Sequence, residues 1–172
     1  DYDGTTLKES WSPIAEGGTY RYDAMQISAN KTLEINATGA SVIIYIEGNV
    51  NINGEIRIAS GCSVSLYVGG NTSIAGQGVV NESRDPSKFV LYGSGKCDLT
   101  GSSDFYGVVY APEVNIDVTG GAKVYGCLIG DTVKVSGGGE VHYDERVADL
   151  ANSSPFKNFE FKPHSWQEVS SS

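Results

Sequence analysis

Five copies of one short pattern follow one another along the middle of this chain, and they constrain its fold more than any other feature. Each copy holds three short runs in which apolar and polar residues alternate, and glycine-rich turns separate the runs. Such alternation is typical of a strand with one buried face. A repeat of about 20 residues cannot bury that face alone and must stack on its neighbours. The copies therefore predict an all-β, single-stranded parallel β-solenoid. They begin at Val42, Val64, Phe89, Val108 and Cys127.

Stacking the equivalent positions gives the predicted register of the coils. The first runs align Tyr45, Tyr67, Tyr92, Tyr110 and Ile129. The second runs supply the inward pairs Val50/Ile52, Thr72/Ile74, Cys97/Leu99, Val114/Ile116 and Val133/Val135. The third runs align Ile56/Ile58, Val79, Phe105, Val124 and Val141. Glycine lies in every turn between the second and third runs, at Gly54, Gly76, Gly101, Gly120 and Gly137. A weaker first coil, Met25/Ile27 and Leu33/Ile35, brings the prediction to about six coils. Since parallel crossovers are usually right-handed, we expect a right-handed solenoid.

The length and the repeat together predict one domain over residues 1–172, with coils over 24–143. An open last coil is an unpaired sheet edge that invites aggregation, so we expect a cap at each end. At the N-terminus, residues 1–23 offer Trp11, Tyr20 and Tyr22 to cover the first coil.

The C-terminal cap is expected over residues 144–172. Residues 144–151 read as a short helix with Val147 and Leu150 packed inward, and an aromatic tail follows. The alternative is that this tail docks on a partner protein. The aromatic residues of the tail are Phe156, Phe159, Phe161 and Trp166.

Charge limits the kinds of partner. The 21 acidic residues against 12 Lys and Arg give a net charge of −9, which argues against nucleic acid or an anionic membrane surface. No apolar run approaches the roughly 20 residues of a membrane span, and there is no signal peptide or starting methionine. We therefore expect a processed or trimmed ectodomain.

The three cysteines do not form a recognisable motif. Cys62, Cys97 and Cys127 lie in different coils without the C-x-x-C spacing of zinc or redox sites. We expect them to be buried free thiols that pack as small apolar groups. A disulfide between neighbouring coils is the alternative.

No catalytic, metal or cofactor site is predicted. His142, Asp144 and Glu145 are close in sequence and could supply a base or a metal ligand. However, alternation sends neighbouring residues to opposite faces, and no second cluster supplies further ligands or a nucleophile. Glu47 and Glu113 fall on one side of the solenoid, but the positions between them carry Gly69 and Ser94 or Gly95. That is too sparse for a pair of catalytic carboxylates.

A candidate binding surface comes from three further tyrosines. Tyr106, Tyr125 and Tyr143 follow the inward Phe105, Val124 and Val141, at intervals of 19 and 18 residues. They are expected to form an outward stripe, which could stack on sugar rings or only on itself between coils.

Several segments resemble a known family. They are FYGVVYAP from Phe105, GAKVYGCLIG from Gly121 and HYDE from His142, with YIEGNVNI, NESRDPSKFVLYG and Trp166 in support. Together they resemble a domain of unknown function found at the C-terminus of PilX-type type IV pilus assembly proteins and related bacterial surface proteins. The resemblance implies a domain that follows an anchoring hydrophobic helix at the cell surface. The coils are also similar to those of bactofilins, although polymerisation through bare end coils fits long aromatic ends poorly.

From these observations we expect a non-enzymatic structural or adhesion module, extracellular or at the bacterial cell surface. Its expected partners are pilus or envelope proteins or surface glycans, without nucleic acid and without a cofactor. The alternatives are a carbohydrate-binding or carbohydrate-active β-helix and a bactofilin-like polymer.

Overall fold

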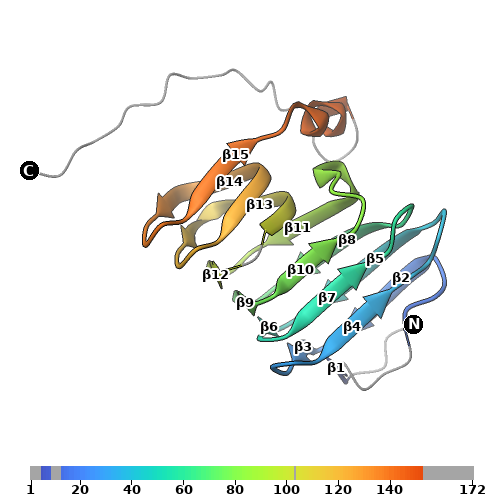
Figure 1. Ribbon diagram of the computed structural model, residues 1–172. Coiled ribbons are helices and arrows are strands. Elements are labelled where there is room, and N and C mark those ends of the chain that lie inside the picture. Colours follow the sequence, from blue (N-terminus) through green and yellow to red (C-terminus); the bar gives the residue numbers. More distant parts are fainter. Residues whose placement is uncertain (1–4, 9–12, 103, 153–172) are drawn as a thin grey trace, which may run out of the picture.

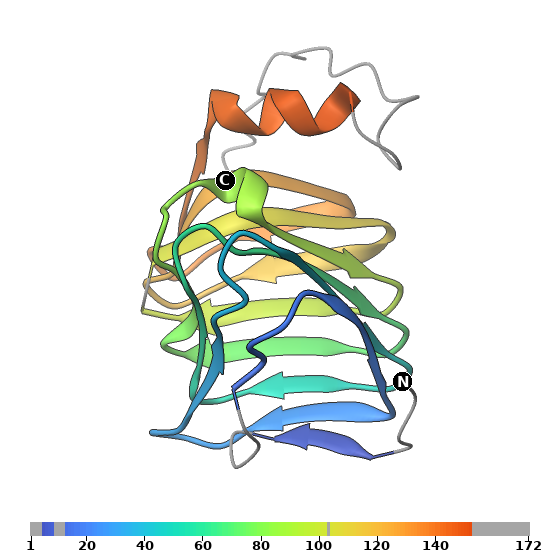
Figure 2. The same ribbon diagram turned by 90° about the vertical axis from the view of Figure 1, so that its right-hand side faces the viewer.

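The computed structural model describes residues 5–8, 13–102 and 104–152. These residues form an all-β parallel solenoid of about five turns, one fewer than the repeats predict. The strands stack as rungs from the N-terminal end to the C-terminal end (Figures 1 and 2). The fold prediction is therefore confirmed, and the handedness stays a prediction.

Each turn of the solenoid contributes to three strand columns, and all the pairings are parallel. The first column contains β2 (Gly18–Tyr22), β5 (Ser41–Ile46), β8 (Ser63–Val68) and β11 (Phe89–Gly93). The second contains β1 (Thr6–Lys8), β3 (Ala24–Ile27), β6 (Val50–Ile52), β9 (Thr72–Gly76) and β12 (Cys97–Gly101). The third contains β4 (Thr32–Ile35), β7 (Glu55–Ile58) and β10 (Gly78–Asn81). In the last coils β13 (Asp104–Val118) and β14 (Lys123–Val135) run through all three columns, and β15 (Glu140–Tyr143) closes the third.

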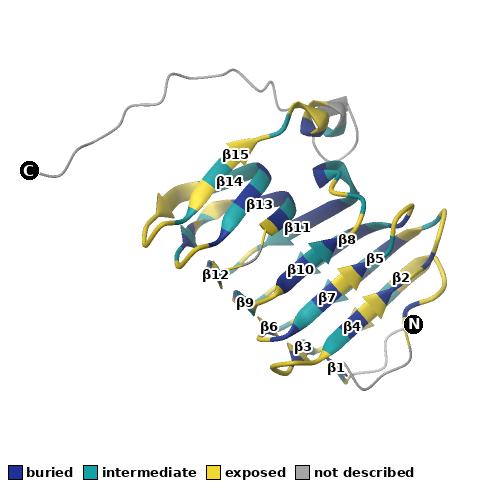
Figure 3. Ribbon diagram, viewed as in Figure 1, coloured by how far each residue is buried: buried dark blue, intermediate teal, exposed yellow. Residues whose placement is uncertain are grey.

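The inward side chains form one continuous core. Buried and exposed residues alternate along the strands (Figure 3), as the period of two requires. Ile52, Ile58 and Cys97 are fully buried in this core. At the turn after the first column, asparagines also stack: the backbone N–H of Asn71 donates to Asn49 Oδ1 at 2.9 Å.

In the second column the predicted register is right in four of the five copies and wrong by two residues in the copy that begins at Val108. Tyr45, Tyr67, Tyr92, Tyr110 and Ile129 stack as predicted. In the second column, however, Cys97 pairs with Ile116 and Leu99 pairs with Val118, so Val114 is not part of the inward pair. The reason is an irregularity between Ala111 and Asn115 that takes up extra residues at the corner.

The turn glycines serve two different purposes. Gly76, Gly120 and Gly137 take positive φ angles of 64°, 74° and 65°, which cost glycine little. At Gly54 the reason is space, because a Cβ there would overlap the carbonyl oxygens of Ser28 and Lys31 in the preceding coil.

The loop of residues 81–87 is anchored by a buried asparagine. Asn81 is 3% exposed, and its Nδ2 donates to the carbonyl oxygens of Asp85 at 2.8 Å and of Tyr106 at 3.3 Å. Its Oδ1 accepts a hydrogen bond from Ser83 Oγ at 2.7 Å. The loop then enters a short 3₁₀ turn, η1 (Pro86–Lys88), which Asp85 caps by accepting from the Ser87 N–H. Asn81 thus ties the loop to the next coil.

The N-terminal segment continues the solenoid, which corrects the predicted separate cap over residues 1–23. β1 pairs with β3, β2 pairs with β5, and Ile14 forms a bridge with Ile35 in the third column. Tyr22 is buried and Tyr20 packs against the core. Trp11 lies outside the described residues.

The predicted C-terminal helix exists, but as the 3₁₀ helix η2 (Glu145–Asn152). It packs against the outside of the first column beside η1, not over the end of the core. Val147 is 2% exposed and contacts the cluster of Val90 and Val108, with Leu150 partly buried against the same cluster. Both residues therefore pack inward as predicted, but onto this outer cluster and not onto the main core. The predicted tail residues Phe156, Phe159, Phe161 and Trp166 lie outside the described residues.

Candidate ligand-binding groove

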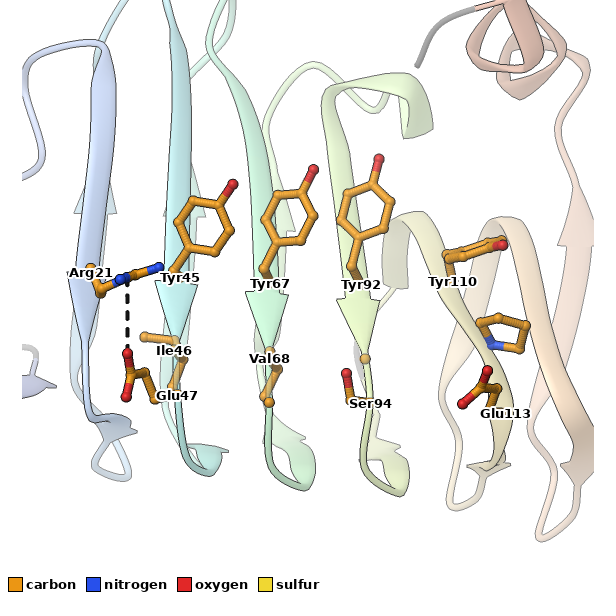
Figure 4. Close-up of a pocket in the computed structure, with 13 residues that line it drawn as sticks. Arg21, Tyr45, Ile46, Glu47, Tyr67, Val68, Tyr92, Ser94, Tyr110 and Glu113 are labelled. Atoms are coloured by element: carbon orange, nitrogen blue, oxygen red, sulfur yellow. Dashed lines mark ion pairs between the residues drawn. The ribbon is translucent and has the colours of Figure 1, made fainter. Parts of the chain in front are cut away.

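A groove of 530 Å³ runs along the outside of the first strand column. Four tyrosines line it: Tyr45, Tyr67, Tyr92 and Tyr110 (Figure 4). Alternation explains their orientation in β5, where Tyr45 lies between the inward Ile44 and Ile46. Because parallel pairing keeps equivalent residues in register, one outward tyrosine per coil becomes a ladder.

The rings of the ladder are stacked with an offset. Tyr45 and Tyr67 have ring centroids 4.8 Å apart and planes 19° apart, and Tyr67 and Tyr92 have values of 4.3 Å and 8°. Stacked carbon atoms touch at about 3.5 to 4.0 Å, so the larger centroid distances mean that each ring is shifted past the next. Part of each ring face therefore stays open to the groove. Tyr110 ends the row, tilted by 64° to Tyr92 with centroids 6.1 Å apart.

Charged groups lie at the two ends of the groove. Arg21 lies 5.6 Å from the centroid of the Tyr45 ring and pairs loosely with Glu47 at 4.0 Å. Glu113 lies at the opposite end, beside Tyr110 (Figure 4). Gly69 and Ser94 occupy the rungs between the two glutamates, as the sequence predicts.

The two glutamates are too far apart to act together on one bond. Three rungs separate Glu47 from Glu113, which at about 4.8 Å for each rung is roughly 14 Å. Paired carboxylates of glycoside hydrolases lie about 5 to 9.5 Å apart. The groove therefore offers stacking surfaces and hydrogen-bonding groups, without a matched acid and base.

The phenols in the middle of the ladder are held in their neutral form. Burial raises the pKa of Tyr67, with a further contribution from the nearby Tyr45 phenol, and a hydrogen bond with Tyr92 acts in the opposite direction. Burial also raises the pKa of Tyr92, strongly, with the Tyr67 phenol adding to the effect. Both hydroxyls therefore remain protonated near neutral pH, and they hydrogen-bond to each other.

η2 supports the C-terminal half of the groove. Tyr92 and Tyr110 pack against the small apolar cluster that Val147 of η2 forms with Val90 and Val108. Cys127 packs against the same cluster. The outer helix thus fixes the positions of two groove tyrosines, a role that the sequence pattern did not suggest.

The predicted stripe of Tyr106, Tyr125 and Tyr143 forms only in part. Tyr106 stacks on Tyr125 with centroids 4.7 Å apart, and the next ring in the row is His142, at 4.9 Å from Tyr125. Tyr143 instead pairs with Gly126 and is 57% exposed. The error is one of register: Val141 pairs with Val124, so the outward position that follows it is His142. Arg84 covers the other end of this second ladder, 5.9 Å from the Tyr106 centroid.

The acidic and histidine residues near the last coil form ion pairs and do not converge on a site. His142 Nε2 lies 2.9 Å from Glu140 Oε2, and Lys123 Nζ lies 3.3 Å from Glu140 Oε1. Asp144 is held by Arg146, whose Nε donates to it at 3.0 Å. Within the described ranges, no three His, Cys, Asp or Glu side chains are grouped as metal ligands would be.

The cysteines are free thiols, as expected. Cys62 and Cys97 are buried in the core and Cys127 is half-buried. Burial is the main cause that raises the pKa of each thiol, which leaves them poor nucleophiles. They pack as small apolar groups.

Comparison with known proteins identifies the family of the chain but no activity. Residues 3–150 match the model of a domain of unknown function, DUF7305. No curated protein and no solved structure matches the chain. The family match names neither PilX-type proteins nor bactofilins. No helix in the described part of the chain is long and apolar enough to cross a membrane. The chain belongs to the DUF7305 family.

Proposed function

We propose that this DUF7305 domain is a non-enzymatic adhesion module that binds an extended glycan in its tyrosine groove. The observation that carries the proposal is the row of four tyrosines at regular intervals along one open groove. The rings give apolar faces for the C–H side of sugar rings. The phenol oxygens of Tyr67 and Tyr92 can accept hydrogen bonds from the sugar hydroxyls.

The spacing of the ladder suits a polymer of sugars. Successive tyrosines are one coil step apart, about 4.8 Å, and a pyranose ring is about as long as that step. Each sugar of an extended chain would therefore meet a similarly oriented ring along Tyr45, Tyr67 and Tyr92, and the tilted ring of Tyr110 would meet the next sugar. A repeating ligand on a repeating scaffold gains affinity with each coil that it crosses.

The charges of the groove favour a neutral or amino-sugar glycan. The groove is edged by Glu47 and Glu113, while Arg21, the cation among its described lining residues, is engaged with Glu47 and the Tyr45 ring. The whole chain carries a net charge of −9. An anionic polysaccharide would be repelled by the groove glutamates and by the net negative charge of the chain.

The cellular setting of the proposal rests on the sequence resemblance. Segments such as FYGVVYAP and HYDE resemble surface domains of PilX-type pilus assembly proteins. A rod of stacked coils that projects from a pilus or from the envelope would present the groove along its length. Pilus or envelope proteins are the partners that we propose on its other surfaces, with an extracellular or cell-surface location.

A glycan array tests the function. The purified wild-type domain is compared with a groove variant, Tyr67→Ala/Tyr92→Ala, and with a matched control on the second ladder, Tyr106→Ala/Tyr125→Ala. Circular dichroism establishes that all three proteins are folded. We expect specific glycan signals for the wild type and the control, and their loss in the groove variant. No signal with any glycan would contradict the proposal, and loss only in the control would place binding on the second ladder instead.

A further inference from the structure

The last coil leaves its inward side chains uncovered in the described structure. Val133 is 39% exposed and Val135 is 44% exposed, whereas the residues below them, Ile116 and Val118, are fully buried. Figure 3 shows the C-terminal part of β14 in the colour of exposed residues. Within the described residues no strand pairs with the outer edge of Thr132–Val135. This end therefore combines an apolar surface with a free row of backbone donors and acceptors, a combination that favours the addition of a strand.

The sequence beyond η2 supplies a strand with matching spacing. Phe159 and Phe161 alternate with Glu160 and Lys162, so the two aromatic side chains would lie on one face. Phe159 and Phe161 are two residues apart in the sequence, as Val133 and Val135 are. The segment follows directly from η2, which ends at Asn152 beside the last coil.

The number of residues between the third column and the following second column also matches that of an existing coil. In the coil that contains η1, the inward residues Cys97 and Leu99 follow Val79 of the third column by 18 and 20 residues. After the last coil, Phe159 and Phe161 follow Val141 of the third column by the same 18 and 20 residues. Both intervals contain a 3₁₀ segment at the same corner, because η2 packs beside η1. The tail therefore reaches the second column after the same number of residues as in the coil with η1, although η2 extends to Asn152, where the earlier coil already has β11 in the first column.

We propose that residues 158–162 add to the edge of Thr132–Val135 as a parallel strand, with Phe159 over Val133 and Phe161 over Val135. This strand supplies the second column of one more coil and covers the end of the core. It keeps the edge from pairing with another molecule. The occupant is a segment of the same chain, and a second copy of the protein is the competing occupant.

Disulfide trapping tests the register. In a parallel ladder, facing residues have Cα atoms about 4.8 Å apart, within the range of about 4.4 to 6.8 Å that a disulfide accepts. We expect the Val133→Cys/Phe159→Cys variant to form a disulfide within one chain under mild oxidation, as shown by peptide mass mapping of the monomer. The matched control is Val133→Cys/Glu160→Cys, whose new thiols would point to opposite faces, and it should form at least tenfold less. Equal yields in the two variants, or a disulfide only between chains, would overturn the proposal.

Hydrogen exchange provides a second measurement that needs no new cysteine. In the wild-type chain, the amides of residues 132–135 and 158–162 should exchange at least tenfold more slowly than in Phe159→Ser/Phe161→Ser. Trp166→Ser serves as a control outside the strand and should leave their protection unchanged. Fast exchange of both segments in the wild type would contradict the added strand.

Discussion

The buried asparagine at the start of the 81–87 loop makes a strong prediction about stability. Asn81→Ala removes hydrogen bonds to the carbonyl oxygens of Asp85 and Tyr106 and the one from Ser83. A typical hydrogen bond contributes about 0.5 to 1.5 kcal/mol, and leaving a buried polar group unpaired costs about 1 to 3 kcal/mol. Because Asn81 is only 3% exposed, water cannot readily replace these partners. We expect a loss of about 3 kcal/mol in the free energy of unfolding.

Urea unfolding followed by circular dichroism measures this loss. The matched control is Asn51→Ala, at an exposed outward position of β6, which should change the free energy of unfolding by less than about 0.5 kcal/mol. Ser83→Ala should fall between the two, since it removes one of the three hydrogen bonds of Asn81 and the one that Ser83 Oγ accepts from the Asp85 N–H. An Asn81→Ala variant within about 0.5 kcal/mol of the wild type would refute the idea that this residue anchors the loop.

Four other predictions follow from the packing, from two titrating groups and from the groove. Gly54→Ala should destabilise the fold by at least about 2 kcal/mol, since its Cβ would overlap two carbonyl oxygens; Gly121→Ala, with open space around the new Cβ, should be nearly neutral in the same thermal melts. The pKa of Tyr92 is raised above its ordinary value of 10.0, so its contribution to stability is present below pH 10 and is lost as the pH rises toward the native pKa. Ultraviolet titration should show a phenol that ionises only at high pH, and this phenol should be missing in Tyr92→Phe. Identical titration curves for the two proteins would count against the burial of Tyr92. Arg146 lowers the pKa of Asp144 below its ordinary value of 3.8, so this pair stabilises the fold above pH 3.8, and its contribution is lost as the pH falls through the native pKa. In Asp144→Asn the free energy of unfolding should therefore fall less steeply at acid pH. The same acid dependence in variant and wild type would show that the pair does not contribute to it. For a glycan that binds, affinity should rise with chain length up to about four sugars, the number of tyrosine rungs, and calorimetry that shows no length dependence would argue against binding along the groove.

Alternation and repeat length were sufficient to predict the solenoid and most of its register. The column of Tyr45, Tyr67, Tyr92 and Tyr110 could be read directly, because each coil places one tyrosine at the same step after an inward pair. That these tyrosines line a groove was also within reach, since alternation around Ile44 and Ile46 sends Tyr45 outward. The binding surface expected from the sequence is a different one, the stripe of Tyr106, Tyr125 and Tyr143.

The errors came from places where the chain departs from regular spacing. The shift of Val114 out of the inward pair arises from an irregularity at the corner after Ala111, which alternation cannot foresee. A difference of one residue in the last turn replaced Tyr143 with His142 in the second ladder. The position of η2 on the outside of the solenoid depends on the apolar outward Val90 and Val108. Outward valines at equivalent positions of neighbouring coils were the signal that a covering element packs there.

The most direct test of the groove is the affinity of one glycan, identified on the array, for the wild-type domain and for Tyr67→Ala. Tyr67 lies in the middle of the ladder, with stacked rings on both sides. Removing a stacking ring should cost about 1 to 1.5 kcal/mol of binding, or roughly tenfold in Kd, while Tyr125→Ala on the second ladder should bind like the wild type. We predict this pattern in isothermal titration calorimetry. Equal affinity of Tyr67→Ala and the wild type, with both proteins folded, would contradict the account.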